Sequence, residues 1–104
     1  MSEPFKSYMV NATEKILNAF LAPRFPEIEE IKVSEYADDR VSLSIKVSKV
    51  KDIMGFASSV DREIKPILSM IGGIYDSLGV TRKGDIEFNL LSRVFFPKSY
   101  NTSD

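Results

Sequence analysis

The chain has 104 residues, 43% of them hydrophobic and 28% charged, which fits a single domain over residues 1–104 with its own packed core. Fourteen Lys and Arg against fifteen Asp and Glu leave a net charge of −1, so the strongly basic surface of sequence-independent nucleic-acid binders is excluded. With no Cys and no His, the chain cannot form disulfides, thiolate or imidazole metal sites, Cys or His nucleophiles, or a His general base.

The sequence also limits the expected location of the protein. Charged residues interrupt the first twenty positions, so we expect no secretory signal peptide. The longest nearly uncharged stretch, residues 66–75, is about half of the ~20 apolar residues that a membrane-spanning helix needs. Absence of Cys fits a reducing compartment. We therefore expect a cytoplasmic protein that has no contact with a membrane.

The first element is expected to be an amphipathic helix over residues 4–21. Its apolar residues recur at helical spacing, at Phe5, Met9, Ala12, Ile16 and Phe20. Pro23 and Pro26 then end the pattern.

Two short strands are expected to follow as an antiparallel hairpin. Residues 41–48 alternate strictly between apolar and polar, which is typical of a strand with one buried and one solvated face. Ile31 and Val33 alternate with Lys32 and Ser34, and the polar residues 37–40 between the two runs predict a turn.

A long helical pattern occupies residues 50–78. Its apolar stripe continues through Ile71, Ile74 and Leu78, and Gly79 stands where a helix commonly ends. One straight helix of this length would be about 43 Å long, too long for a domain of this size. We therefore predict a break near Lys65-Pro66 and two shorter helices.

A third strand is expected over residues 85–96, ended by Pro97, with a polar and frayed tail from about residue 98. The predicted element order is α-β-β-α-(α)-β. This order indicates a two-layer α+β fold, in which helices cover one face of a three-stranded, mainly antiparallel sheet.

The acidic residues suggest little chemistry. Asp38-Asp39 lacks the ligand spacing of a calcium loop, and Asp85 and Glu87 share a strand face without a visible partner. The glycines lack the Lys and Ser/Thr of a phosphate-binding loop. We expect no catalytic residues, no metal site, no cofactor and no small-molecule ligand.

The end of the third strand suggests an interface. This strand is longer than the second, so its last third has no obvious partner within the chain. Apolar side chains occur there on both faces, Leu91 and Phe95 on one and Val94 and Phe96 on the other. Three explanations remain open: a bulge near Leu91-Ser92, packing beneath the first helix, or pairing with another chain. We favour an interaction or assembly module that self-associates or pairs with a protein partner through this strand. The candidate interface residues are Leu91, Arg93, Val94, Phe95 and Phe96.

The alternative function is RNA binding. Five basic residues could converge on one edge of the sheet, namely Lys46, Lys49, Lys51, Arg82 and Lys83. The element order resembles KH-type RNA-binding folds, including ribosome-assembly factors whose helix bends where this chain has Ala57-Ser58-Ser59. The resemblance implies an RNA partner. The Gly-x-x-Gly of KH domains is absent from this sequence.

Overall fold

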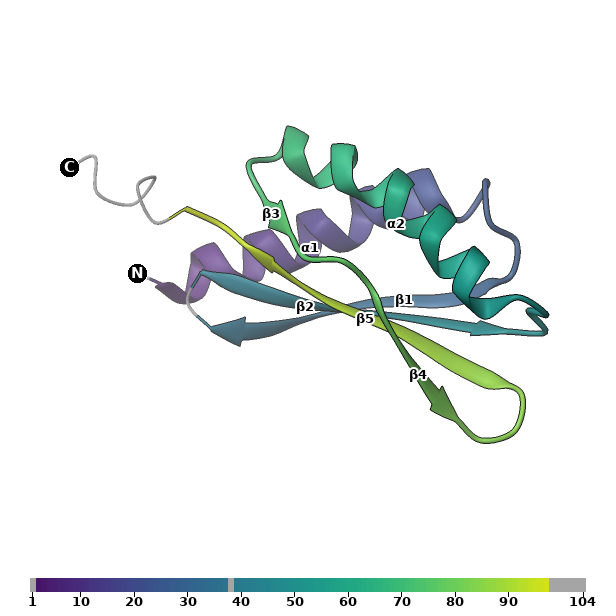
Figure 1. Ribbon diagram of the computed structural model, residues 1–104. Helices are drawn as coiled ribbons and strands as arrows, with labels where there is room; N and C mark the ends of the chain where they lie inside the picture. The colour runs from purple at the N-terminus through teal and green to yellow at the C-terminus, as the bar shows by residue number, and fades with distance from the viewer. Residues whose placement is uncertain (1, 38, 98–104) are drawn as a thin grey trace.

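The computed structural model describes residues 2–37 and 39–97, with side chains from residue 8 onward. Within these ranges the elements are α1 (Ser2–Leu21), β1 (Ile28–Ala37), β2 (Arg40–Ser48), α2 (Ile53–Met70), β3 (Ile74–Tyr75), β4 (Gly79–Lys83) and β5 (Glu87–Phe95). Both helices cover the same face of one antiparallel sheet (Figure 1). The two-layer α+β class is confirmed, whereas the three-stranded sheet and the order α-β-β-α-(α)-β are wrong. The tail expected from about residue 98 lies outside the described residues.

β5 runs through the middle of the sheet. β2 pairs with it along one edge, from Arg40 opposite Phe95 to Ser48 opposite Glu87. β3 and β4 pair with it in succession along the other edge, while β1 pairs with β2. The expectation that the end of this strand lacks a partner inside the chain is therefore wrong.

A bulge near Leu91-Ser92, one of the three explanations left open, is not present in β5; an irregularity lies instead between β3 and β4. The register between β5 and β2 has no shift, so β5 carries no bulge against β2. On the other edge, Tyr75 and Gly79 are four residues apart, but their partners Val94 and Leu91 are only three apart. One extra residue thus lies between β3 and β4, and the buried Ser92 hydroxyl donates to a backbone carbonyl at this point (2.9 Å).

The core lies between the sheet and the two helices. Alternate residues of the strands face it, and the fully buried strand residues are Leu43, Ile45, Val47, Leu90 and Val94. The buried face of α1 includes Met9, as expected, but differs further along the helix: Thr13, Leu17 and Leu21 are buried, whereas Phe20 is 46% exposed. The two rows are neighbours on the helix and both are largely apolar, so the spacing alone did not separate them. Neither helix in the described ranges is long and apolar enough to span a membrane.

α2 is one helix that ends earlier than expected. It passes through Pro66 without a break and stops at Met70. Gly72 has a φ of 81°, and its N–H donates to Ser69 O while that of Gly73 donates to Leu68 O. These two bonds and the left-handed glycine form a Schellman motif. The predicted second helix to residue 78, and Gly79 as its end, are therefore wrong.

Gly73 allows the chain to turn back closely onto the sheet. A Cβ at this position would lie 2.8 Å from Val94 Cγ1 and 3.1 Å from Phe96 Cε1. The turn after α2 thus delivers β3 directly against the core side chains of β5. Because of this close approach, the apolar residues after Met70 form a strand at the edge of the sheet and not a further helix.

Candidate functional site

Two arginines and two aromatic residues meet on the sheet face that the helices do not cover. The Arg40 guanidinium carbon lies 6.0 Å from the Tyr36 ring centroid and 5.3 Å from that of Phe95. The Arg93 guanidinium carbon lies 5.0 Å from the Tyr36 ring centroid. The Arg40 and Phe95 side chains are close together because these residues lie opposite one another in the β2–β5 pairing. We call these four residues the Arg–aromatic cluster.

This cluster combines positive charge with exposed apolar surface. Arg40 Nε lies 3.5 Å from Asp39 Oδ1 but is buried without a hydrogen bond. Tyr36 is 49% exposed. Two further apolar side chains of the sheet are exposed, Ile74 opposite Phe95 and Leu91 two rows along β5. The result is a surface on which arginine and aromatic groups alternate.

The predicted interface residues fall on opposite sides of the sheet. Leu91, Arg93 and Phe95 belong to the uncovered face, where Leu91 is 39% exposed and Arg93 is exposed. Val94 and Phe96 are 0% and 3% exposed and belong to the core. The end of β5 thus has apolar side chains on both faces because one of these faces packs against the helices of the same chain.

The other end of the uncovered face carries balanced charges. Lys46 Nζ lies 2.8 Å from Glu87 Oε2 and 3.9 Å from Glu29 Oε1, and Ser48 Oγ donates to Glu29 Oε2. A hydrogen bond from Lys46 and its positive charge lower the pKa of Glu87, and Glu87 in turn raises the pKa of Lys46. A shallow pocket of about 240 Å³ lies here.

The basic residues of the RNA hypothesis do not form a free basic patch. Lys46 is paired with carboxylates, and Lys49 and Lys83 line a pocket together with Glu29, Asp85 and Glu87. Arg82 donates from Nε to Gly84 O (3.0 Å) and from Nη2 to Asp85 O (3.2 Å). Lys51 is exposed in the loop before α2.

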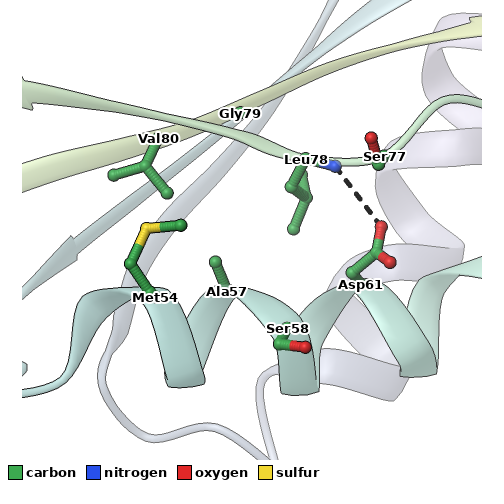
Figure 2. A pocket seen from close by; sticks show the side chains of 8 residues that line it. All are labelled: Met54, Ala57, Ser58, Asp61, Ser77, Leu78, Gly79 and Val80. Carbon is green, nitrogen blue, oxygen red and sulfur yellow. Dashed lines mark hydrogen bonds between the residues drawn. The ribbon is translucent and has the colours of Figure 1, made fainter.

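A groove of about 370 Å³ lies between α2 and β4 (Figure 2). Its lining residues are Met54, Ala57, Ser58, Asp61, Ser77, Leu78, Gly79 and Val80. Asp61 is the ionisable residue among them, and its Oδ1 accepts a hydrogen bond from the Leu78 N–H (3.3 Å). Val80 and the exposed Met54 thioether face one another across the groove in Figure 2. We call this feature the α2–β4 groove.

Tyr75 lies close to Asp61, one of the residues that line this groove. Its hydroxyl is buried and makes no hydrogen bond. Burial, and then the neighbouring Asp61 carboxylate, raise the pKa of Tyr75 far above its ordinary value. The phenol is therefore neutral at physiological pH.

The structure adds site residues that the sequence did not suggest. Tyr36 and Arg40 were assigned to no surface, because their contacts depend on the irregular register at the end of the first hairpin. The α2–β4 groove was missed because no strand was expected between Gly79 and the strand predicted over residues 85–96. Among the described residues no group of three or more Asp and Glu is placed to hold a metal ion, and Asp38 lies outside them.

Comparisons with protein-family models, curated proteins and solved structures find no match. The element order differs from the one on which the KH resemblance depended, because β3 and β4 follow α2 where a second helix was expected. Ala57-Ser58-Ser59 lies within an uninterrupted α2.

Proposed function

We propose that this chain is a non-catalytic protein–protein interaction module that binds its partner through the Arg–aromatic cluster. The observation that carries the proposal is the position of the Arg40 and Arg93 guanidinium groups over the exposed ring of Tyr36, with Arg40 also over the half-buried ring of Phe95. Arginine, tyrosine and phenylalanine are enriched in protein interfaces, and Tyr and Arg are prominent among the residues that contribute most to binding. Leu91 extends the apolar part of the surface.

The cluster suits a partner that combines carboxylates with apolar side chains. A guanidinium group held over a ring keeps its N–H edge available for a bidentate bond to a carboxylate. Asp39 lies within ion-pair distance of Arg40, at 3.5 Å from its Nε. Val94 and Phe96 anchor β5 in the core, so their role in this interface is indirect. Absence of Cys supports a cytoplasmic location, which we include in the proposal.

RNA is the second candidate ligand, because an uncovered sheet face with aromatic and arginine side chains also suits unpaired bases. The observations favour a protein. Both rings of the cluster already have an arginine stacked against them, and the lysines at the other end of the face alternate with carboxylates. The experiment below separates the two ligands.

The test is an NMR titration of the ¹⁵N-labelled protein with a blocked peptide in which glutamate alternates with leucine and tyrosine. We expect the amide resonances of Tyr36, Arg40, Arg93 and Phe95 to shift. Replacing glutamate by glutamine in the peptide should weaken binding. Arg93→Gln should weaken it by about fivefold or more, in line with the ~1 kcal/mol or more lost at an important interface residue.

Arg62→Gln is the matched control, since Arg62 is an exposed arginine on α2, away from the uncovered sheet face. Its binding should equal that of the unchanged protein. Shifts confined to other surfaces, or equal binding of both peptides, would contradict the proposal. If a single-stranded oligouridine binds in a salt-sensitive manner that depends on Arg93, the partner of this surface is RNA and not a protein.

A further inference from the structure

We propose that two copies of this chain associate edge to edge through β4, each strand closing the α2–β4 groove of the other copy. The two sheets would then form one continuous antiparallel sheet around a twofold axis. This interface is distinct from the Arg–aromatic cluster, so it does not depend on the proposed function. Self-association is thereby assigned to β4, which has a free edge, and no longer to β5, which has a strand paired along each of its edges.

β4 offers a backbone edge without a strand partner. It pairs with β5 along one edge, and no described strand pairs with the other. The β4–β5 hairpin extends away from α2 (Figure 1), and residues 81–83 of β4 are exposed. Unpaired backbone groups beside an apolar groove are a template for an added strand.

The opposite sheet edge, β1, is less suited to pairing. It has register irregularities near both ends, between Ile28 and Glu30 and between Glu35 and Ala37. It also carries several charged residues, Glu29, Glu30, Lys32 and Glu35. Bulges and charges of this kind protect strand edges from association.

The backbone of β4 fixes one preferred alignment. The Leu78 N–H points away from β5 toward Asp61, so by alternation the backbone groups of Val80 and Arg82 also point to the free edge. A twofold axis at Val80 pairs this residue with its own counterpart. The same alignment brings Arg82 of the second copy opposite Leu78.

Charge complementarity supports a second copy as the occupant. Asp61 makes no ion pair within the described part of the chain. Arg82 lies opposite Phe88 in the sheet, on the same face as Val80 and the buried Leu90, which is the face that α2 covers. The alignment therefore places the Arg82 guanidinium of each copy near the Asp61 carboxylate of the other. Its present hydrogen bonds, to two exposed carbonyls of its own turn, leave it free to rearrange.

Apolar surface would be covered at the same time. Met54 is 67% exposed at the mouth of the groove, and Val80 is half-buried. Both would lie close to the axis and meet their counterparts. The flexible methionine side chain adapts readily to such a junction.

The natural absence of cysteine permits a direct test of the alignment. Opposed residues in a hydrogen-bonded antiparallel pair have Cα atoms about 5.5 Å apart, within the range that a disulfide spans. We expect Val80→Cys to form a disulfide-linked dimer on mild oxidation. Thr81→Cys is the control, because residue 81 would not face its counterpart and its side chain lies on the other face of the sheet. Its cross-linking should be at least about tenfold slower.

Sedimentation equilibrium of the unchanged protein and of charge variants gives the second measurement. We expect a dimer that Asp61→Arg weakens by about tenfold or more, and that the double variant Asp61→Arg/Arg82→Asp restores. Asp85→Arg reverses an exposed carboxylate outside the groove and should leave the dimer unchanged. Circular dichroism confirms that each variant is folded.

A protein that stays monomeric at high micromolar concentration would overturn this proposal, as would equal cross-linking of the two cysteine variants. If the protein is a monomer and an extended peptide of alternating valine and lysine binds in the groove, the occupant is another protein and not a second copy of this chain. Neither result affects binding of the acidic peptide at Arg93, so the two proposals fail separately.

Discussion

The ion pair between Lys46 and Glu87 joins β2 and β5 on the uncovered face of the sheet. The hydrogen bond from Lys46 lowers the pKa of Glu87 below the ordinary glutamate value. A carboxyl whose pKa is lower in the folded state adds stability above its unfolded pKa and loses that contribution as the pH falls through its folded pKa. We expect the side-chain carboxyl resonance of Glu87, followed by NMR, to titrate at a lower pH than an exposed glutamate.

Lys46→Gln should return the Glu87 midpoint toward the ordinary glutamate value, and added salt should do the same in part. Lys32→Gln is the matched control, because Lys32 lines the same pocket but makes no ion pair among the described residues. An unchanged Glu87 midpoint in Lys46→Gln would contradict the assignment. The raised pKa of Lys46 acts in the opposite direction, so its contribution is lost only as the pH rises above the lysine range.

At the scale of single elements, α2 continues through a proline. Pro66 cannot donate to the carbonyl of Arg62, and α2 still reaches Met70. Apolar burial at Ile64 and Leu68 on either side of the proline holds the helix together. We expect Pro66→Ala to raise the free energy of unfolding by about 1–2 kcal/mol, measured by urea denaturation, because the lost hydrogen bond is regained.

Lys65→Ala provides the comparison, since Lys65 is an exposed neighbour that already donates its N–H within the helix. Its effect should stay within about 0.5 kcal/mol. A destabilised Pro66→Ala would mean that the proline ring contributes packing that the helix needs.

The same elements show what could be read from the sequence. The strict alternation of residues 41–48 predicts β2 correctly, because period-two patterning is incompatible with a helix. The pattern failed after Met70: Ile71, Ile74 and Leu78 keep helical spacing, but the Schellman motif at Gly72 ends the helix and close packing of Gly73 starts a strand. Three of the five residues of β4 are polar or charged, so they gave no strand signal.

The candidate surfaces depend on pairings between segments far apart in the chain. Arg40 and Phe95 meet because β2 and β5 are neighbours in the sheet. Local spacing identified Arg93, Leu91 and Phe95 as one face of a strand, but it could not supply Tyr36 from the other side of the first hairpin. The sequence therefore identified the residues that β5 contributes to the Arg–aromatic cluster. It missed Tyr36 and Arg40, which reach the cluster only because of the order of strands in the sheet.

At the scale of the whole molecule, stability should be greatest at the centre of the sheet and least at its edges. β2 and β5 each have a strand on both sides, and their inward residues Leu43, Ile45 and Leu90 are fully buried. Amides there exchange only when central pairing is lost. We expect the slowest hydrogen exchange, measured by NMR, in β2 and β5, with faster exchange in β1.

Exchange at β4 then depends on association. In a monomer, the Val80 amide faces an open edge and should exchange rapidly; in an edge-to-edge dimer it is hydrogen-bonded across the twofold axis. Its protection should therefore rise with protein concentration and fall in Asp61→Arg, while protection in β2 and β5 stays constant. Rapid exchange of Val80 at every concentration would show that the β4 edge stays unpaired, and equal protection of β1 and β2 would show that sheet position does not govern local stability.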